Sequence, residues 1–283
     1  MFAEDITSAN IVGYTSPACN SGWKIYGTQF QGVTAGTAEI NIQDYVKIGD
    51  DATKVYYDED LTFQGKAPHL QIPNRTVPGG QAEMYYYLQD PWYLGPDGED
   101  DWRNDKPGWA NGDGIRVEDV TITPGMAFWI KNQQTDNENF SVTLPGQVPN
   151  LTASFDNTTP GGGLWFLASS AFPNGLFINS PLVEVSNAPE VYYDEDLTFQ
   201  GKALHLQIPN RTNPNGQAEM YYYLQNPWYL GPDGEEDWRN DKPGFADGDG
   251  MLVVDTAATL PVGTGFWLKS SAQSTLTYSG SAD

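Results

Sequence analysis

A long internal duplication constrains the fold of this chain more than any other feature. The segment from Val55 to Asp119 returns as Val191 to Asp255, with ten differences in 65 positions, no gap and a constant offset of 136. After a two-residue insertion the copies align again, as PGMAFWIK at 124–131 and VGTGFWLK at 262–269. A repeat of this length predicts tandem domains rather than a solenoid of short units.

The duplication divides the 283 residues into two units. We expect a first domain at 1–145, a linker at 146–160 that mixes Pro, Asn, Thr and Gly, and a second domain at 161–283. Each unit has the length of an ordinary domain and is long enough to bury a core without disulfides.

Short apolar segments with strand periodicity, bounded by Gly, Pro and Asn, fill both units. The alternative of a short helical turn is open for Ile42–Val46, and no amphipathic helix exceeds two turns. We therefore predict an all-β chain of two tandem β-sandwich or barrel-like domains. The strands expected in unit one are Ile11–Tyr14, Trp23–Phe30, Ile40–Ile48, Val55–Tyr57, Leu70–Ile72, Met84–Leu88, Ile115–Val117, Phe128–Ile130 and Phe140–Leu144.

The charge of the chain is strongly one-sided, with 37 acidic against 14 basic residues and a net charge of -23. Such a balance disfavours nucleic acid and anionic membranes as partners, because their phosphates would repel it. It favours solubility, a bound cation or a cationic partner. No apolar run approaches the roughly 18 residues that a membrane span needs, so we expect no membrane insertion.

The first residues and the composition predict an exported protein. The start, with FAED at 2–5, is similar to the end of a processing site from which the signal peptide has been removed. Abundant Gly, Pro, Asn and Thr with little Lys suit an extracellular all-β protein. Cys19 is the single cysteine, so no intrachain disulfide can form. We expect the protein outside the cell or at the cell surface.

An acidic loop recurs in both units and is the candidate cation site. Calcium binds six to eight oxygen ligands, and flexible loops of this composition can supply them. The spacing matches no standard calcium loop, and solvated Asp and Asn side chains that cap turns are the plainer alternative. The candidate ligands are Asp97, Glu99, Asp100, Asp101, Asp105, Asp233, Glu235, Glu236, Asp237 and Asp241.

A second pair of carboxylates lies in the repeated YDED segment. Asp58 and Asp60 would share one face of an extended segment, as would Asp194 and Asp196 in unit two. Paired carboxylates can hydrolyse glycosidic bonds. A turn between strands is the structural alternative for the same residues.

Aromatic side chains gather beside the acidic loop in both units. Exposed Trp and Tyr among Asp and Asn are typical of sugar-binding platforms, and equally of protein–protein interfaces. The residues expected at such an interface or glycan site are Trp92, Tyr93, Trp102, Trp109, Trp228, Tyr229, Trp238 and Phe245.

Standard catalytic motifs are missing from the sequence. His69 and His205 stand alone at equivalent positions, and we interpret them as strand residues with satisfied rings rather than as metal ligands. We therefore expect a protein that is not an enzyme and requires no cofactor, although Ca²⁺ could bind.

Opening and closing motifs of the units resemble a class of exported bacterial tandem β-repeat surface proteins. The opening resemblance rests on Gly22–Gly27 and Phe30, and the closing one on Pro124–Lys131. Unit two departs from the pattern, with Leu164–Ala168 at its opening and Val262–Gly263 in place of Pro-Gly. The resemblance implies a small secreted β domain at the cell surface and brings no established activity.

The leading functional hypothesis is a secreted structural subunit that associates with itself into a filament, tube or surface layer. Near-identical aromatic surfaces in two units would make quasi-equivalent contacts, and edge strands could extend a neighbour's sheet. A carbohydrate-binding module is the alternative, and a glycoside hydrolase is the third hypothesis.

Overall fold

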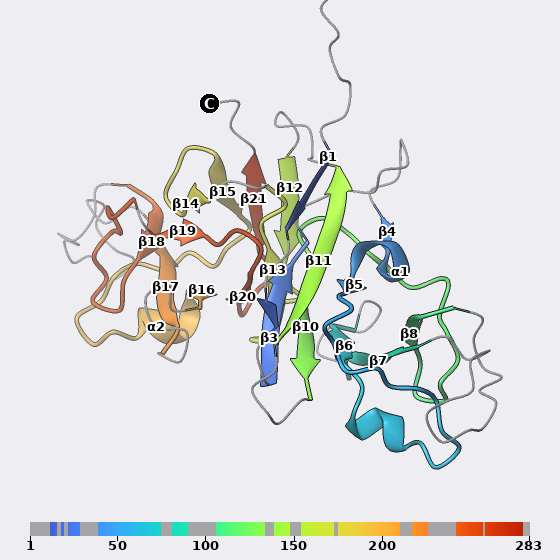
Figure 1. The fold of residues 1–283 in the computed structure, drawn as a ribbon. Helices are drawn as coiled ribbons and strands as arrows, with labels where there is room; N and C mark the ends of the chain where they lie inside the picture. Colours follow the sequence, from blue (N-terminus) through green and yellow to red (C-terminus); the bar gives the residue numbers. More distant parts are fainter. Residues whose placement is uncertain are drawn as a thin grey trace, which may run out of the picture.

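The computed structural model describes residues 12–15, 18–19, 22–28, 39–74, 81–89, 106–133, 139–147, 154–172, 175–209, 217–225, 242–256 and 258–279. In these ranges antiparallel sheets dominate, and the helical elements are single turns (Figure 1). The predicted all-β, sandwich-like class is confirmed. No helix within the same ranges is long and apolar enough to cross a membrane.

Unit one contains a five-stranded sheet, a second sheet built around one long strand, and a small two-stranded sheet. The order in the first is β3 (Gly22–Gly27), β10 (Ala127–Asn132), β6 (His69–Ile72), β7 (Glu83–Leu88) and β8 (Gly108–Ala110). In the second, β11 (Phe140–Gln147) pairs with β1 (Val12–Thr15), β2 (Ala18–Cys19) and β5 (Lys47–Ile48). The third pairs β4 (Ile40–Asn41) with β9 (Thr121–Ile122).

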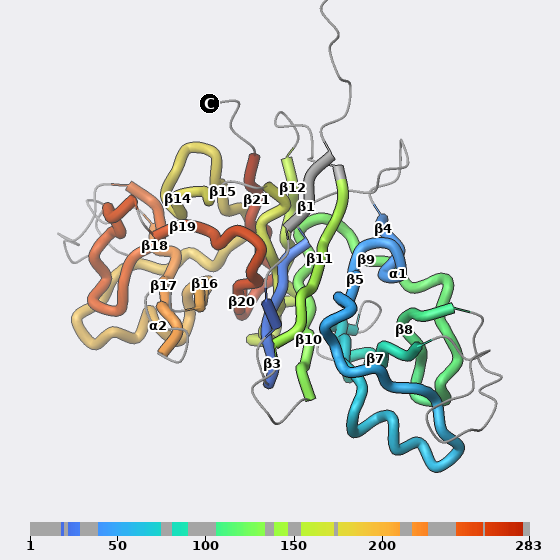
Figure 2. The backbone as a smooth tube through the Cα atoms, in the orientation of Figure 1, coloured from blue at the N-terminus to red at the C-terminus, as the bar shows by residue number. Residues whose placement is uncertain are grey.

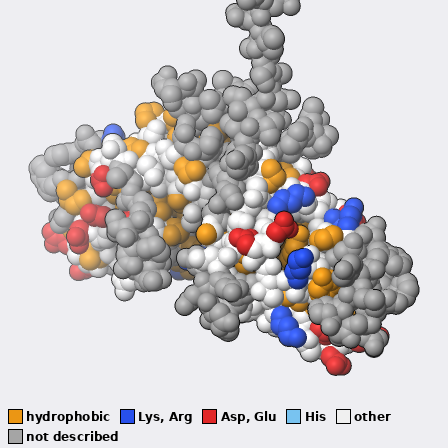
Figure 3. Space-filling model, viewed as in Figure 1, with side chains coloured by type: hydrophobic (Ala, Val, Ile, Leu, Met, Phe, Trp, Pro, Cys, Tyr) orange, Lys and Arg blue, Asp and Glu red, His pale blue; other side chains and the backbone are white. Residues whose placement is uncertain are grey.

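Unit two repeats this plan. Its five-stranded sheet has the order β13 (Trp165–Ser169), β20 (Gly265–Lys269), β16 (Leu204–Ile208), β17 (Glu219–Leu224) and β18 (Gly244–Ala246). A three-stranded sheet joins β12 (Ser154–Thr158), β21 (Thr275–Ser279) and β15 (Val183–Ser186), and β14 (Leu176–Phe177) pairs with β19 (Thr259–Leu260). The backbone path in Figure 2 shows the blue-to-green unit beside the yellow-to-red one. Acidic side chains lie on the described surface of both units (Figure 3).

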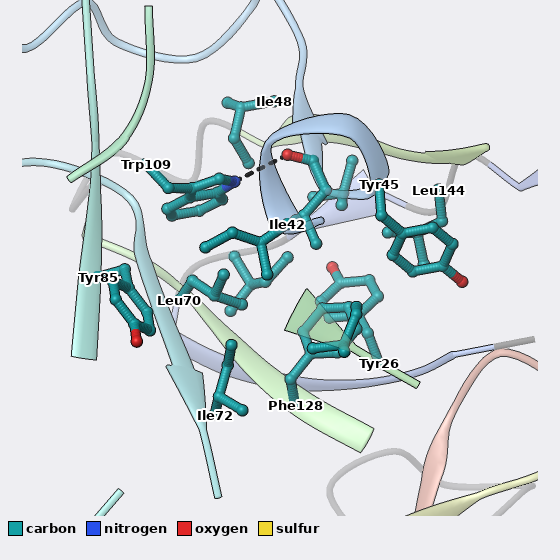
Figure 4. Close-up of a cluster of buried hydrophobic side chains, with 14 of the residues drawn as sticks. Tyr26, Ile42, Tyr45, Ile48, Leu70, Ile72, Tyr85, Trp109, Phe128 and Leu144 are labelled. Atoms are coloured by element: carbon teal, nitrogen blue, oxygen red, sulfur yellow. Dashed lines mark hydrogen bonds between the residues drawn. The ribbon is translucent and has the colours of Figure 1, made fainter. Parts of the chain in front are cut away.

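Strand alternation builds the core of unit one between its two main sheets. In β10, Phe128 and Ile130 are buried, while Trp129 and Lys131, which alternate with them, are partly exposed. They pack with Leu70 and Ile72 of β6 and with apolar residues of β11 (Figure 4). The helical turn α1 (Ile42–Tyr45) closes this core, and the Asn41 side chain caps it by accepting from the Gln43 N–H at 2.8 Å.

Three ranges predicted as strands differ in the structure. For the first of them, a short helical turn was the open alternative. Ile40–Ile48 is not one strand, because α1 lies between β4 and β5, as the helical alternative required. Val55–Tyr57 forms no strand: the Val55 carbonyl accepts a single bond from Gln89 and no ladder follows. Ile115–Val117 is reduced to one bridge, between Arg116 and Ala110.

The other helical elements occupy equivalent places in the two units. They are the 3-10 turn η1 (Thr62–Gly65) and the helix α2 (Phe199–Lys202). Each buries one phenylalanine, Phe63 or Phe199, in a small second cluster.

The range expected as a linker is partly strand. The last residues of β11 and all of β12 fall within 146–160, and β12 pairs along its length with β21 of unit two. Described residues of unit two therefore begin at Ser154, and the separation between the two units is shorter than predicted.

The two units pair through reciprocal contacts at equivalent positions. The Gly27 N–H donates to the Gly263 carbonyl at 3.0 Å, and the Ser169 N–H donates to the Gly125 carbonyl at 2.7 Å. Gly27 and Ser169 are equivalent because they face the first residues of β10 and β20, respectively. This is the isologous geometry of a symmetric dimer, formed here inside one chain.

Side-chain size breaks this symmetry where the units approach most closely. A Cβ atom at Gly27 would lie 2.6 Å from the Cβ of Ser169. A Cβ atom at Gly265 would lie 2.6 Å from that of Ala127, which is its equivalent in unit one. In each pair the close approach requires glycine on one side. The Ser169 hydroxyl uses the space, donating to the Met126 carbonyl at 2.6 Å.

A swap of the first pair tests this constraint. We expect Gly27→Ser to lower the free energy of unfolding by about 1–3 kcal/mol, the usual cost of overpacking. Gly27→Ser combined with Ser169→Gly should recover most of that loss, because a serine at 27 would lie near the Thr264 carbonyl (3.2 Å from a Cβ there), the equivalent of Met126. Denaturant unfolding measures both.

Gly65→Ser is the matched control for this swap, because nothing lies within 4 Å of a Cβ at that position. A double variant no more stable than Gly27→Ser alone would contradict the paired constraint.

Candidate functional site

The outward face of each five-stranded sheet carries aromatic and basic side chains. Because Phe128 and Ile130 point into the core, Trp129 and Lys131 point away from it. The same alternation in β20 turns Trp267 outward. The closing motifs FWIK and FWLK therefore place one tryptophan and one lysine on the outside of each unit.

Trp23 and Trp165 are the most exposed rings on these faces. Their exposed fractions are 42% and 39%. Trp23 lies directly opposite Lys131 on the neighbouring strand, and the Lys131 ammonium is 5.6 Å from its ring centroid. In unit two Lys269 lies 5.4 Å from the ring of Trp165. Such an exposed cation–π contact contributes about 0.5–1 kcal/mol.

Four tryptophans join the two faces into one surface, which we call the tryptophan row: Trp23, Trp129, Trp267 and Trp165. The centroids of Trp129 and Trp267 are 5.4 Å apart, across the contact between the units. Trp267 and Trp165 follow at 6.4 Å with their planes nearly perpendicular. Trp23 occupies the position in β3 that Trp165 occupies in β13. The pairing of the units therefore creates a row that neither unit has alone.

A histidine lies beside the outer tryptophan of each unit. His69 is 6.1 Å from Trp23 and 4.8 Å from Tyr86, and His205 is placed alike between Trp165 and Tyr222. Each ring donates its Nε2 proton to a carbonyl, that of Gln64 or Gln200. Burial lowers the pKa of both rings, so the neutral form is favoured. Both histidines lie on strands, β6 and β16, as predicted. The prediction of satisfied rings is wrong for His205, because its buried Nδ1 has no hydrogen-bond partner among the described residues.

Two of the predicted interface residues are core residues, which corrects the expectation for them. Trp109 is 0% exposed and Phe245 is 1% exposed. The Trp109 indole N–H donates to the Val46 carbonyl at 2.8 Å (Figure 4), and Gln43 bonds both backbone groups of Trp109. Asn179 does the same for Phe245. The exchange of Trp for Phe is therefore a packing difference, not a change in a contact surface.

The remaining predicted aromatic residues lie outside the described residues, so no geometry tests them. They are Trp92, Tyr93, Trp102, Trp228, Tyr229 and Trp238. The same holds for every candidate calcium ligand, namely Asp97, Glu99, Asp100, Asp101, Asp105, Asp233, Glu235, Glu236, Asp237 and Asp241. Among the residues with described positions, no group of His, Cys, Asp and Glu could hold a metal ion.

The YDED carboxylates have a structural task in both units. Asp58 accepts from the Thr62 backbone N–H and hydroxyl, both at 2.6 Å, and so caps η1. Asp194 accepts from Thr198 in the same way before α2. The YDED segments therefore form the turn that was the alternative to a pair of catalytic carboxylates.

The single cysteine, Cys19, is fully buried.

Sequence reasoning missed the tryptophan row as a site, although its signal was present. FWIK and FWLK alternate an inward Phe with an outward Trp, and GWKIYG places Trp23 in strand period. What the sequence did not provide was the pairing of β10 with β3 and of unit one with unit two. Searches with protein-family models, among curated proteins and among solved structures found no match to this chain.

The buried histidines predict a pH dependence of stability. Because their folded pKa values lie below the ordinary value of 6.5, the unfolded state binds more protons in that range. Their contribution is complete above pH 6.5 and decreases as the pH falls below it. We expect the unfolding free energy of the double variant His69→Gln/His205→Gln to fall less between pH 7.5 and 5 than that of the wild type.

Carboxylate titrations are common to both proteins and cancel in this comparison. Because the chain has only two histidines, NMR titration of the folded protein reads their pKa values directly. Values at or above 6.5 would contradict the prediction.

Proposed function

We propose that this chain is an extracellular carbohydrate-binding protein that holds a polysaccharide on its tryptophan row. The observation that supports the proposal is the row itself: Trp129, Trp267 and Trp165 contact one another across the two units. Trp23 lies on the same sheet face as Trp129, at the position in unit one that Trp165 has in unit two. Large exposed apolar surface is uncommon on a folded monomer unless it serves an interaction. The expected secretion of the protein fits this role.

The chemistry around the row suits sugars. The faces of a pyranose ring carry C–H groups that stack on an indole, and its edge carries hydroxyl groups. Ligand sites combine such aromatic surface with a few polar groups that fix orientation. Here Gln71 lies opposite Trp129, and Gln207 lies opposite Trp267. The lysines over the outer rings add donors for hydroxyl oxygens.

The charge of the chain indicates which polysaccharides the row would accept. A net charge of -23 repels polyanions at long range, and two lysines on the row do not offset it. Neutral polymers are not repelled by this charge. We therefore propose uncharged polysaccharides as the ligand class.

Self-association, the leading hypothesis from the sequence, needs a contact that does not close. The contact between the units is isologous, and such a contact closes on itself instead of propagating. It joins β3 and β10 to β13 and β20 where Gly27 meets Ser169 and Ala127 meets Gly265, while Trp23 and Trp165 stay exposed. The contact between equivalent surfaces therefore does not propagate, and this supports ligand binding over a filament.

Loss of the two outer rings should strongly weaken binding. We expect Trp23→Ala/Trp165→Ala to weaken binding to neutral polysaccharides by about 30-fold or more, since truncating a tryptophan hot spot costs about 2 kcal/mol or more. Pull-down on cellulose, chitin and mannan, and affinity electrophoresis in soluble β-glucan and xylan, measure it.

Ile115→Ala/Met251→Ala is the matched control. These residues are also equivalent and exposed, at 47% and 46%, but they lie outside the row. Equal losses in the two double variants, or wild-type protein that binds none of these polymers, would refute the proposal.

Sedimentation velocity distinguishes the structural-subunit hypothesis. A binding protein with a closed contact between its units should sediment as single chains at high concentration, with or without Ca²⁺. Concentration-dependent growth to large species that survives Trp23→Ala/Trp165→Ala would favour a structural assembly instead.

A further inference from the structure

The two ends of the tryptophan row differ in what covers the histidine. In unit one the Gln133 side-chain amide lies 3.0 Å from Nε2 and 3.5 Å from Nδ1 of His69. The equivalent position in unit two, after the same closing strand, is Ser271. A serine is too short to make this contact, and Ser271 is exposed. The glutamine cap is therefore specific to unit one.

In unit two, where this glutamine is missing, the Nδ1 atom of His205 has no hydrogen-bond partner among the described residues. The ring is only 8% exposed, and its Nε2 donates to the Gln200 carbonyl. A carbonyl can only accept, so the proton of the neutral ring is on Nε2 and Nδ1 is an acceptor. Nδ1 is buried and has no hydrogen-bond partner among the described residues. A buried acceptor without a partner is costly, and in native proteins it calls for an explanation.

We infer that the unit-two end of the row is the principal sugar subsite, where a ligand hydroxyl donates to Nδ1 of His205 while the sugar ring lies on Trp165. At the unit-one end, Gln133 covers the corresponding histidine and leaves Trp23 as a stacking surface alone. This inference rests on the proposed function and adds a difference between the two ends of the row. The unit-two end would bind a sugar by stacking and a hydrogen bond, and the unit-one end by stacking alone.

A flexible side chain lies beside His205 on the face that carries the row. Trp165 and Lys269 both lie beside His205 on this face. Lys269 contacts the Trp165 ring by an exposed cation–π interaction and has no carboxylate partner among the described residues. An exposed contact of this kind contributes only about 0.5–1 kcal/mol, so the lysine can move aside at small cost when a sugar binds.

The subsite selects ligands by hydrogen-bond direction. The neutral imidazole offers only an acceptor, so the ligand group must donate. Sugar hydroxyl groups donate, whereas an ionised carboxylate does not, so the group at Nδ1 is a hydroxyl. The net charge of the chain disfavours polyanions, and together the two observations name the ligand class as neutral glycans with free hydroxyls.

Exchange of the two capping positions tests the inference. With cellohexaose, xylohexaose, mannohexaose and chitohexaose as probes, we expect Ser271→Gln to weaken binding of the hexasaccharide preferred by the wild type about tenfold. An installed glutamine would place its amide against the imidazole, as Gln133 does at His69, and exclude the sugar hydroxyl. Gln133→Ser should leave the affinity unchanged or raise it. Ser271→Ala is the control for loss of the serine hydroxyl and should bind as the wild type does.

Nitrogen NMR of the imidazoles gives a second readout that a structural effect would not imitate. On addition of the hexasaccharide, the Nδ1 resonance of His205 should shift as it accepts a hydrogen bond, while that of His69 should not. Equal effects of both exchanges, or an unmoved His205 signal, would overturn the inference. In that case the proposed function still stands if the wild type binds these probes and Trp23→Ala/Trp165→Ala weakens binding. If the wild type binds none of them, the proposed function and the His205 subsite are both refuted.

Discussion

The reciprocal contact between the two units is the constraint on which the rest of the molecule depends. Two backbone hydrogen bonds, from Gly27 to Gly263 and from Ser169 to Gly125, hold equivalent strands together. The same approach brings Trp129 within 5.4 Å of Trp267, so the outward faces of both sheets merge. A single unit would present two tryptophans, and the pair presents four. The surface is a consequence of the duplication, not of either copy.

This contact also accounts for part of the divergence between the copies. Side chains that meet near a two-fold axis must fit against their own equivalents, and two Cβ atoms do not fit where the backbones touch. Gly27 against Ser169, and Ala127 against Gly265, are unequal for this reason. In the near-identical middle of the repeat, described residues form separate cores around Trp109 and Phe245, where no such conflict arises.

Periodicity in the sequence was sufficient for the fold class and for most strands. The alternation in β10 and β16, and the turn chemistry of YDED, depend on neighbours in the chain and were readable. Val55–Tyr57 was misjudged because a strand needs a partner ladder, which local pattern does not reveal. Trp109 was misjudged because its acceptor, Val46, is 63 residues away. The outer rings needed the register that sets Lys131 opposite Trp23. Only tertiary pairing supplies these facts.

The exposure of the outer tryptophans contrasts with the burial of Trp109. Trp109 demonstrates that this fold can bury a tryptophan completely and satisfy its N–H. Burying an aromatic side chain stabilises a protein by about 1.5–3 kcal/mol. A cation–π contact between a lysine and an exposed ring contributes only about 0.5–1 kcal/mol. Trp23 and Trp165 therefore lack the stabilisation that full burial would add, and they lack it at the same position in both units. A ligand that covers the rings would recover it.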